Sequence, residues 1–322
     1  MDRNLALDVV RVTETAALRA ARYMGLGDKN AADQAGVDGM RRMFDTIDID
    51  GIVVIGEGEM DEAPMLYIGE RVGIGGPGSP KVDIAVDPVE GTISVAEGMP
   101  NAIAVIAMAP RGCLLHAPDM YMDKLAVGPK AAPYVHLDAS IQDNLRATAG
   151  ALGKSINDLT VAILNRERHA GIIEECRNVG ARIKLFLNGD VDAALATCFE
   201  ETGVDIMLGS GGAPEGVIAA AGIKCMGGNF QGRLLPYGDE EELRCEGMGI
   251  DCALTLTLDD LVKGNEAYYA ATGISDGALL KGVSFSPNGL AHTYSVVMRS
   301  ESGTIRYVNA VHNLNKKPLY AF

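Results

Sequence analysis

The stretch Lys81–Thr92, KVDIAVDPVEGT, carries the strongest structural signal in the chain. Residues 82–86 alternate between aliphatic side chains and Asp83 or Ala85, and this period of two predicts a short buried strand. Pro88 has no backbone N–H to donate to a neighbouring strand, so we expect the chain to turn there.

Two carboxylates follow this strand, because Asp87 and Glu90 stand three residues apart and Gly91-Thr92 comes directly after them. In α/β sheets the carboxyl ends of strands are where ligands gather. Carboxylates crowded at one turn repel each other unless a cation lies between them, and Mg²⁺ or Mn²⁺ suits oxygen ligands. Taken alone, the segment fits equally well an acidic surface turn in which Thr92 caps a helix.

The composition is that of a globular protein with one or two domains: 322 residues, 48% hydrophobic and 22% charged. There is no uninterrupted apolar run of ~18 residues and no secretory signal pattern, so we expect a cytoplasmic protein without a membrane span. The six cysteines show no C-x-x-C spacing, which favours reduced core thiols over zinc. A net charge of −15 argues against nucleic acid as a partner, and it means that any phosphate-ester ligand needs local cations.

The N-terminal region predicts two helices, over residues 2–24 and from a cap at Asn30 to about Phe44. Asp33 lies four residues before Val37 and therefore on the same apolar stripe of the second helix. A carboxylate facing the interior requires a partner or a metal ion. The alternative is that an acid in the first helical turn simply complements the helix dipole, and the local sequence slightly favours that interpretation.

A second buried strand, residues 52–55, also ends at a carboxylate, because Glu57 follows it between Gly56 and Gly58. A solvated acidic loop is the ordinary explanation for the acids that continue the run, which are Glu59, Asp61 and Glu62. However, strands 52–55 and 82–86 both end in a carboxylate beside a turn residue. If the two strands are parallel or adjacent, their ends meet.

Further along the chain, residues 101–115 predict two strands around a Pro-Arg-Gly turn, and residues 139–158 predict a helix. We place the boundary between two halves near residue 150. The expected organisation is a metal-binding half at 1–150, containing DPVEGT, and an α/β substrate-binding half at 151–322.

The second half repeats a strand followed by a helix three times, with strands at 159–164, 182–187 and 204–208. Alternating strands and helices predict a mostly parallel sheet whose polar residues gather at the carboxyl edge. Further strands are expected at 265–272 and in a hairpin at 291–312.

Two features of this half point to a phosphate ligand. Residues 209–217, GSGGAPEGV, form a glycine-rich segment before a helix, where backbone N–H groups cradle phosphates, although the P-loop pattern is absent. Glu215 in that segment also fits the start of a helix. Arg166 and Arg168 fall in the opening turn of a helix, where the dipole disfavours cations, and this misfit favours a ligand-binding role.

The motif D-P-x-E-G-T resembles the D-P-x-D-G-T signature of the metal-dependent, lithium-sensitive sugar and inositol phosphatases. With Glu at the fourth position it resembles the class II fructose-1,6-bisphosphatases of bacteria. The resemblance covers nearly the whole chain, through the segments GDKNAAD, GIVVIGEGEMDEAPMLYIGE, VDIAVDPVEGT, APDMYM, NGDV, GGAPEGV, MGI and ATGI.

This resemblance implies a layered α/β/α/β/α sugar-phosphatase fold. It places the metal ligands on Asp33, Glu57, Asp87, Glu90 and Glu215. It places catalytic roles on Thr92 and Asp33, and leaves open whether Asp33 chiefly binds metal or serves Thr92. The substrate-binding positions that it implies are Glu90, Gly91, Thr92, Tyr121, Arg166, Glu167, Arg168, Asn188, Gly189, Asp190 and Gly212.

The implied activity is hydrolysis of the 1-phosphate of fructose 1,6-bisphosphate with Mn²⁺ or Mg²⁺, in gluconeogenesis, by a homo-oligomer (dimer or tetramer). Asn188 stands where relatives often carry the first Asp of Asp-Gly-Asp, which leaves open a bifunctional fructose-1,6-/sedoheptulose-1,7-bisphosphatase. An inositol-type monophosphatase and a catalytically silent sugar-phosphate sensor also stay open. Retention of Thr92 and all five acids weighs against the sensor.

Overall fold

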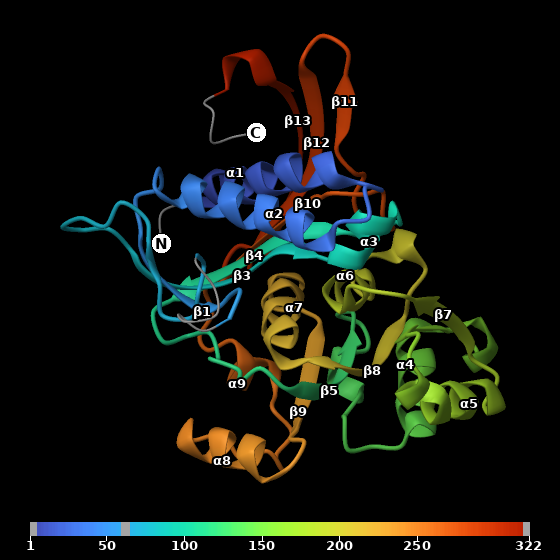
Figure 1. The fold of residues 1–322 in the computed structure, drawn as a ribbon. Helices are drawn as coiled ribbons and strands as arrows, with labels where there is room; N and C mark the ends of the chain where they lie inside the picture. The colour runs from blue at the N-terminus through green and yellow to red at the C-terminus, as the bar shows by residue number, and fades with distance from the viewer. Residues whose placement is uncertain (1–4, 59–64, 318–322) are drawn as a thin grey trace. The chain divides into compact units, whose positions relative to one another are not determined.

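The computed structural model describes residues 5–58 and 65–317. The chain forms two compact units, one made of Met1–Leu114 and Asn265–Phe322 and the other of Leu115–Gly264 (Figure 1). This division differs from the boundary near residue 150, because the segment after Gly264 returns to the first sheet and residues 121–127 already belong to the second. The roles assigned to the two halves stay predictions.

In the described part of the first unit, one sheet has the strand order β11-β12-β10-β4-β3-β1-β2, with β13 paired to β12. The neighbouring strands β1 and β3 are parallel, with Asp50 opposite Lys81, which confirms that their carboxyl ends lie side by side. The strands are β1 (Asp50–Ile55), β2 (Arg71–Val72), β3 (Lys81–Glu90), β4 (Ile103–Pro110), β10 (Tyr268–Gly273), β11 (Ser284–Ser286), β12 (Leu290–Arg299) and β13 (Thr304–Asn313).

The helices of this unit are α1 (Leu5–Ala20), α2 (Lys29–Phe44) and α3 (Thr92–Glu97). Alanines and aliphatic side chains of α1 pack on β10, β12 and β4 and form one apolar core with them. Both predicted N-terminal helices are confirmed, but Asn30 is not the cap of the second. Asp28 caps α2 instead, since its carboxylate accepts a hydrogen bond of 2.9 Å from the N–H of Ala31.

The prediction that the chain turns at Pro88 is wrong, because β3 continues through it to Glu90. The pairing of β3 with β4 shifts register between Asp87 and Glu90, so Pro88 lies in an irregularity where no ladder N–H is required. The second strand predicted within residues 101–115 is also wrong. After β4 the chain turns at Arg111-Gly112, and residues 113–115 form only a single bridge, at Leu114, rather than a strand.

The sheet of the second unit has the order β7-β6-β8-β5-β9. Strands β6, β7 and β8 are parallel and each leads into a helix, as predicted, whereas β5 runs antiparallel to both β8 and β9. Residues 209–212, expected in a loop, are the last residues of β8. The strands are β5 (Tyr121–Val127), β6 (Thr160–Leu164), β7 (Arg182–Phe186), β8 (Ile206–Gly212) and β9 (Asn229–Leu235).

Helices cover both faces of this sheet. Apolar residues of α4 and α5 form a core with alternate residues of β6 and β8, while α6 and α7 pack on each other and on the opposite face. The helices are α4 (Ile141–Leu152), α5 (Ala170–Asn178), α6 (Asp190–Ala196), α7 (Ala213–Met226), α8 (Asp239–Gly247) and α9 (Leu258–Leu261). Short 3-10 helices lie at Ala21–Tyr23, Ala132–Tyr134, Ile156–Asp158, Glu167–His169, Glu200–Thr202 and Leu314–Lys316.

The mixed α/β class is therefore confirmed. None of the helices in residues 5–58 and 65–317 has the length and apolar character that a membrane span requires.

Candidate functional site

In the first unit, predicted site residues collect at the carboxyl edge formed by β1 and β3. Glu57 follows β1, and the last residues of β3 include Asp87 and Glu90. The parallel pairing of the two strands thus positions the three carboxylates at one edge. The acids at 59, 61 and 62 lie outside the described residues.

Asp33 in α2 is hydrogen-bonded to Glu57 across this edge. Burial raises the pKa of the Glu57 carboxyl to about 8, and the negative charge of Asp33 acts in the same direction. Burial also raises the pKa of Asp33, against the lowering effect of the hydrogen bond. The hydrogen bond to Glu57 gives Asp33 a side-chain partner at this edge, which the helix-dipole interpretation alone does not require.

Asp87 and Glu90 each place a carboxylate oxygen within 4.8 Å of the other. The irregularity at Pro88 produces this approach, because successive residues of a regular strand point to opposite faces. The Asp87 carboxylate also accepts a hydrogen bond of 2.9 Å from the N–H of Val89, which fixes the bend. Thr92 comes two residues after Glu90 as the first residue of α3, and is half-buried.

Helix α2 lies directly against this bend. A Cβ on Gly36 would come within 2.5 Å of the Val89 side chain and 3.2 Å of the Pro88 carbonyl oxygen, so only glycine allows the approach. Gly36 is one helical turn after Asp33. The close approach of Gly36 to the β3 bend therefore fixes where Asp33 lies along the sheet edge that carries Glu57 and Asp87.

In the second unit, Arg168 lies in the 3-10 helix that follows β6 and reaches across to β8. Its guanidinium donates hydrogen bonds to the hydroxyl and the carbonyl oxygen of Ser210, at 3.1 and 2.9 Å. It also lies 4.7 Å from the ring centroid of Tyr121, which is opposite Gly212 in the β5–β8 ladder. The structure thus brings together Arg168, Tyr121 and Gly212, three of the predicted substrate-binding positions.

The neighbouring strand ends supply the other predicted positions of this unit. Arg166 donates a hydrogen bond of 3.3 Å to the side-chain oxygen of Asn188, which joins the ends of β6 and β7. Glu167 begins the 3-10 helix that follows and is exposed. Asp190, the first residue of α6 after Gly189, is buried and forms an ion pair of 2.6 Å with Lys124 on β5.

Glu215 lies in the first turn of α7, as the sequence indicates. Its carboxylate folds back over Gly212, within 2.0 Å of the position that a Cβ there would occupy. Gly212 therefore has to be glycine for Glu215 to adopt this conformation. The carboxylate is directed to the start of its own helix, at the same strand edge as Tyr121.

Three functional neighbours in this unit were not predicted: Lys124, Ser210 and His169. Lys124 is only 1% exposed, and its signal is a lysine that shares its strand face with Met122 and Ala126. His169 donates from Nδ1 to the Leu164 carbonyl at 2.7 Å and accepts at Nε2 from the Ser210 N–H at 2.8 Å. Those backbone partners hold a neutral imidazole, which fixes Ser210 and through it Arg168. No sequence pattern indicates that link, because it depends on how β6 and β8 pair.

The side chains of the first unit fit a divalent cation. Asp33, Glu57, Asp87 and Glu90 provide only oxygen donors, which Mg²⁺ and Mn²⁺ prefer. The raised pKa values of Asp33 and Glu57, and the close approach of Asp87 to Glu90, both indicate charge repulsion that a cation would relieve.

Comparison with known proteins first defines the class, which is a phosphatase hydrolase. A family model described as bacterial fructose-1,6-bisphosphatase, glpX-encoded, matches residues 3–312, and the chain belongs to that family. Fructose-1,6-bisphosphatase 1 class 2 of Escherichia coli (strain K12) is 46% identical, over 98% of this chain and 97% of that protein. The class 2 enzyme of Shigella flexneri matches with the same identity and coverage.

Among solved structures, the extragenic suppressor protein SuhB from Bartonella henselae aligns with a TM-score of 0.35 and 13% identity, over 61% of this chain and 74% of that one. An IMPase of Thermotoga maritima aligns with a TM-score of 0.30 and 14% identity, over 59% and 71%. The family assignment rests on the sequence matches alone.

Proposed function

We propose that the chain hydrolyses the 1-phosphate of fructose 1,6-bisphosphate to fructose 6-phosphate and phosphate, as a step of gluconeogenesis. Its relatives at 46% identity are named for this activity. The observation that carries the proposal is the approach of Asp87 and Glu90 to within 4.8 Å of each other, with Glu90 two residues before Thr92. Oxygen donors beside a hydroxyl are what metal-assisted phosphate hydrolysis needs.

The proposed metal ligands are Asp33, Glu57, Asp87 and Glu90 from the first unit and Glu215 from the second, with Mn²⁺ or Mg²⁺ as the ion. Glu215 is assigned through its motif, GGAPEGV, rather than through a contact. A bound divalent cation neutralises phosphate charge and makes water a better nucleophile near neutral pH. The acidic residues hold that ion, and none of them can itself bind a phosphate dianion.

Thr92 is the proposed catalytic hydroxyl, and Asp33 is its proposed proton partner. The backbone at Gly91 has φ 92°, and this left-handed conformation starts α3 so that the Thr92 side chain stands at the strand end. The Thr92 hydroxyl orients the attacking water in line with the phosphorus. The proton that the water loses is transferred through this hydroxyl to a carboxylate. Asp33 is hydrogen-bonded to Glu57 at the same sheet edge, so its carboxylate is the proposed acceptor of that proton.

Arg166 and Arg168 are the proposed ligands of the distal 6-phosphate, with Tyr121, Asn188, Asp190 and Gly212 around the sugar. Glu167, Gly189, Glu90 and Gly91 complete the proposed substrate positions. Arg168 is held by Ser210 on one side and Tyr121 on the other, so its guanidinium is preorganised to donate to a phosphate. This arrangement would select bisphosphates over monophosphates.

A second bisphosphate substrate stays open at Asn188. Asn188 accepts from Arg166 as a neutral amide, where an aspartate would neutralise the guanidinium. Arg166 therefore keeps its full charge for an anionic substrate, and sedoheptulose 1,7-bisphosphate carries the same two phosphates on a longer sugar. We further propose a cytoplasmic location and a homo-oligomeric state, neither of which enters the mechanism.

Phosphate release tests the proposal most simply. Fructose 1,6-bisphosphate, sedoheptulose 1,7-bisphosphate and inositol 1-phosphate are compared with Mn²⁺, with Mg²⁺ and with EDTA. We expect metal-dependent release from the first substrate and little from inositol 1-phosphate. Preference for the monophosphate would overturn the assignment of the arginines, and binding of the bisphosphate without any turnover would indicate a sensor.

A further inference from the structure

Strand β7 (Arg182–Phe186) forms one edge of the second unit's sheet and, among the described residues, pairs only with β6. The ladder shows which backbone groups remain on the outside. Arg182 donates its N–H to Leu159, and Phe186 accepts from Asn165, so the even-numbered residues face β6. The N–H and C=O groups of residues 183, 185 and 187 therefore point outward, as a row ready to pair with another strand.

The side chains on one face of this edge, Ile183 and Leu185, are aliphatic, and Leu187 follows them in the same alternation. Leu185 is 42% exposed, and Leu187, directly after the strand, is 51% exposed. No residue of β7 is fully buried. Natural edge strands are commonly blocked by proline, bulges or charged side chains, and β7 has neither proline nor a bulge in its pairing with β6, while its charges, Arg182 and Lys184, lie on the face opposite Leu185.

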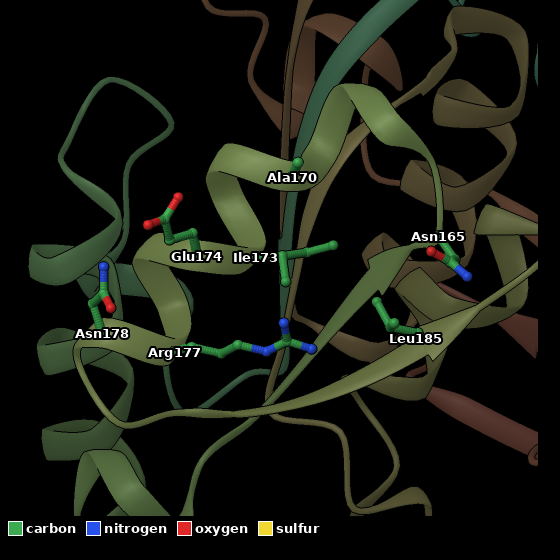
Figure 2. Close-up of a pocket in the computed structure, with 7 residues that line it drawn as sticks. All are labelled: Asn165, Ala170, Ile173, Glu174, Arg177, Asn178 and Leu185. Carbon is green, nitrogen blue, oxygen red and sulfur yellow. The ribbon is translucent and has the colours of Figure 1, made fainter.

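Helix α5 (Ala170–Asn178) borders the same edge. A groove of about 530 Å³ lies between Leu185 and one side of the helix. The helix residues that line the groove have helical spacing and so form one stripe: Ala170, Ile173, Glu174, Arg177 and Asn178. In Figure 2 the Arg177 side chain extends from the helix toward Leu185, with Ile173 beside it and Glu174 one turn earlier.

We propose that this groove and the edge of β7 bind a second copy of the chain around a two-fold axis, with β7 pairing antiparallel to β7 of the partner. The inference is independent of the proposed catalytic activity. It names the surface through which the chain forms a homodimer, and it rests on two kinds of self-complementarity.

The first is the register of the strands. An axis through Leu185 places that residue opposite its own copy, with Ile183 opposite Leu187 of the partner subunit. These are the residues whose backbone groups point outward, so each such pair exchanges hydrogen bonds. Lys184 then lies opposite Phe186 of the partner subunit, whereas an axis through Lys184 would oppose two like charges.

The second is the charge pattern of α5. A two-fold axis sets this helix antiparallel to its copy, so an acid early in the stripe meets a base late in it. Glu174 of one copy then faces Arg177 of the other, and the pair occurs twice in the dimer. A partner with a purely acidic or purely basic face would lack this match.

Sedimentation velocity of the full chain measures the dimer dissociation constant. Reversing one charge by Arg177→Glu replaces attraction by repulsion at two places, and we expect the dissociation constant to rise about 10- to 100-fold. The double variant Glu174→Arg/Arg177→Glu restores the pairing and should return the constant to near the wild-type value. Recovery by the double variant also shows that neither change acts by unfolding the chain.

Disulfide trapping locates the surface directly. Antiparallel residues that share hydrogen bonds lie with their Cα atoms about 5.5 Å apart, within the range of a disulfide. Under mild oxidation Leu185→Cys should therefore become a covalent dimer. Wild type, with its six free cysteines, and Leu243→Cys, on the exposed face of α8, serve as controls and should not.

A monomeric wild-type chain would overturn the proposal. So would an oligomer that neither responds to Arg177→Glu nor cross-links through position 185, because its interface would lie elsewhere.

Discussion

Replacing Arg168 by alanine tests how the chain would recognise a second phosphate. The guanidinium is fixed by two hydrogen bonds to Ser210, at 3.1 and 2.9 Å, and lies 4.7 Å from the ring centroid of Tyr121. Those contacts use Nε and one Nη2 hydrogen, so the remaining N–H groups are available to donate to the 6-phosphate. In a chain of net charge −15, few other groups can offset that dianion.

A charge-assisted hydrogen bond of this kind is worth about 1.5–3 kcal/mol, which corresponds to roughly a 10- to 150-fold rise in KM for fructose 1,6-bisphosphate. Steady-state phosphate release gives KM and kcat for Arg168→Ala and for Arg168→Lys. The lysine variant keeps the charge but cannot reproduce both bonds to Ser210, so it should lie between wild type and alanine.

Two controls separate recognition from folding. Arg146→Ala removes an exposed arginine of α4 and should leave KM unchanged. A small monophosphate should be hydrolysed, poorly, at the same rate by wild type and Arg168→Ala, because it does not extend to Arg168. If both substrates lose activity equally, Arg168 acts on the reacting phosphate or on the fold, and the reasoning is refuted.

Other residues give three further predictions. Thr92→Ala should lower kcat by roughly 10²–10⁴-fold while Thr92→Ser retains more activity, measured with substrate at saturation; equal turnover for Ala and wild type would exclude the role. Lys124→Met leaves Asp190 buried without its cation and should lower the free energy of unfolding, measured in urea, by about 3–5 kcal/mol. The double variant Lys124→Met/Asp190→Asn should lower it less, and equal losses would show that the two residues are not coupled. Burial lowers the pKa of His312 in the folded chain to about 4. As the pH falls from about 6.5 to 4, the unfolded chain therefore binds a proton that the folded chain does not, and the free energy of unfolding should decrease. The raised pKa of Glu14 acts in the opposite direction, since its folded form gains a proton as the pH falls. His312→Asn should therefore remove only the loss of stability on acidification that comes from His312. A pH profile of the thermal midpoint that matches wild type would contradict this prediction. The ionisable groups around His312 are Glu14, His292 and Lys317.

The sequence was most informative where local pattern and topology agree. Period-two alternation located β1 and β3, and the repeated strand-and-helix units located β6, β7 and β8. Because parallel strands end at one edge, the meeting of Glu57 with the acids of β3 within the first unit was predictable from the sequence. So was the gathering of Arg168 and Asn188 at one edge of the second.

Other features depend on contacts that no local pattern reveals. Pro88 is accommodated because the β3–β4 ladder shifts register there, and the glycines at 209–212 are held in β8 by pairing with β5. The assignment of residues 265–322 to the first unit arises from β10 inserting between β4 and β12. The role of Lys124 could not be predicted, since its partner Asp190 is 66 residues away.

The central claim is that carboxylates at strand ends hold a metal ion that the reaction requires. It is tested most directly by phosphate release from fructose 1,6-bisphosphate by the metal-stripped chain, as Mn²⁺ or Mg²⁺ is added back, with Glu90→Gln and Asp48→Asn assayed in parallel. Asp48 is an exposed acid of the same unit, outside the proposed ligand set. The account predicts no turnover in EDTA, recovery on adding metal, a loss of recovery in Glu90→Gln and normal recovery in Asp48→Asn. Full turnover in EDTA, or a Glu90→Gln variant that recovers like wild type, would contradict it.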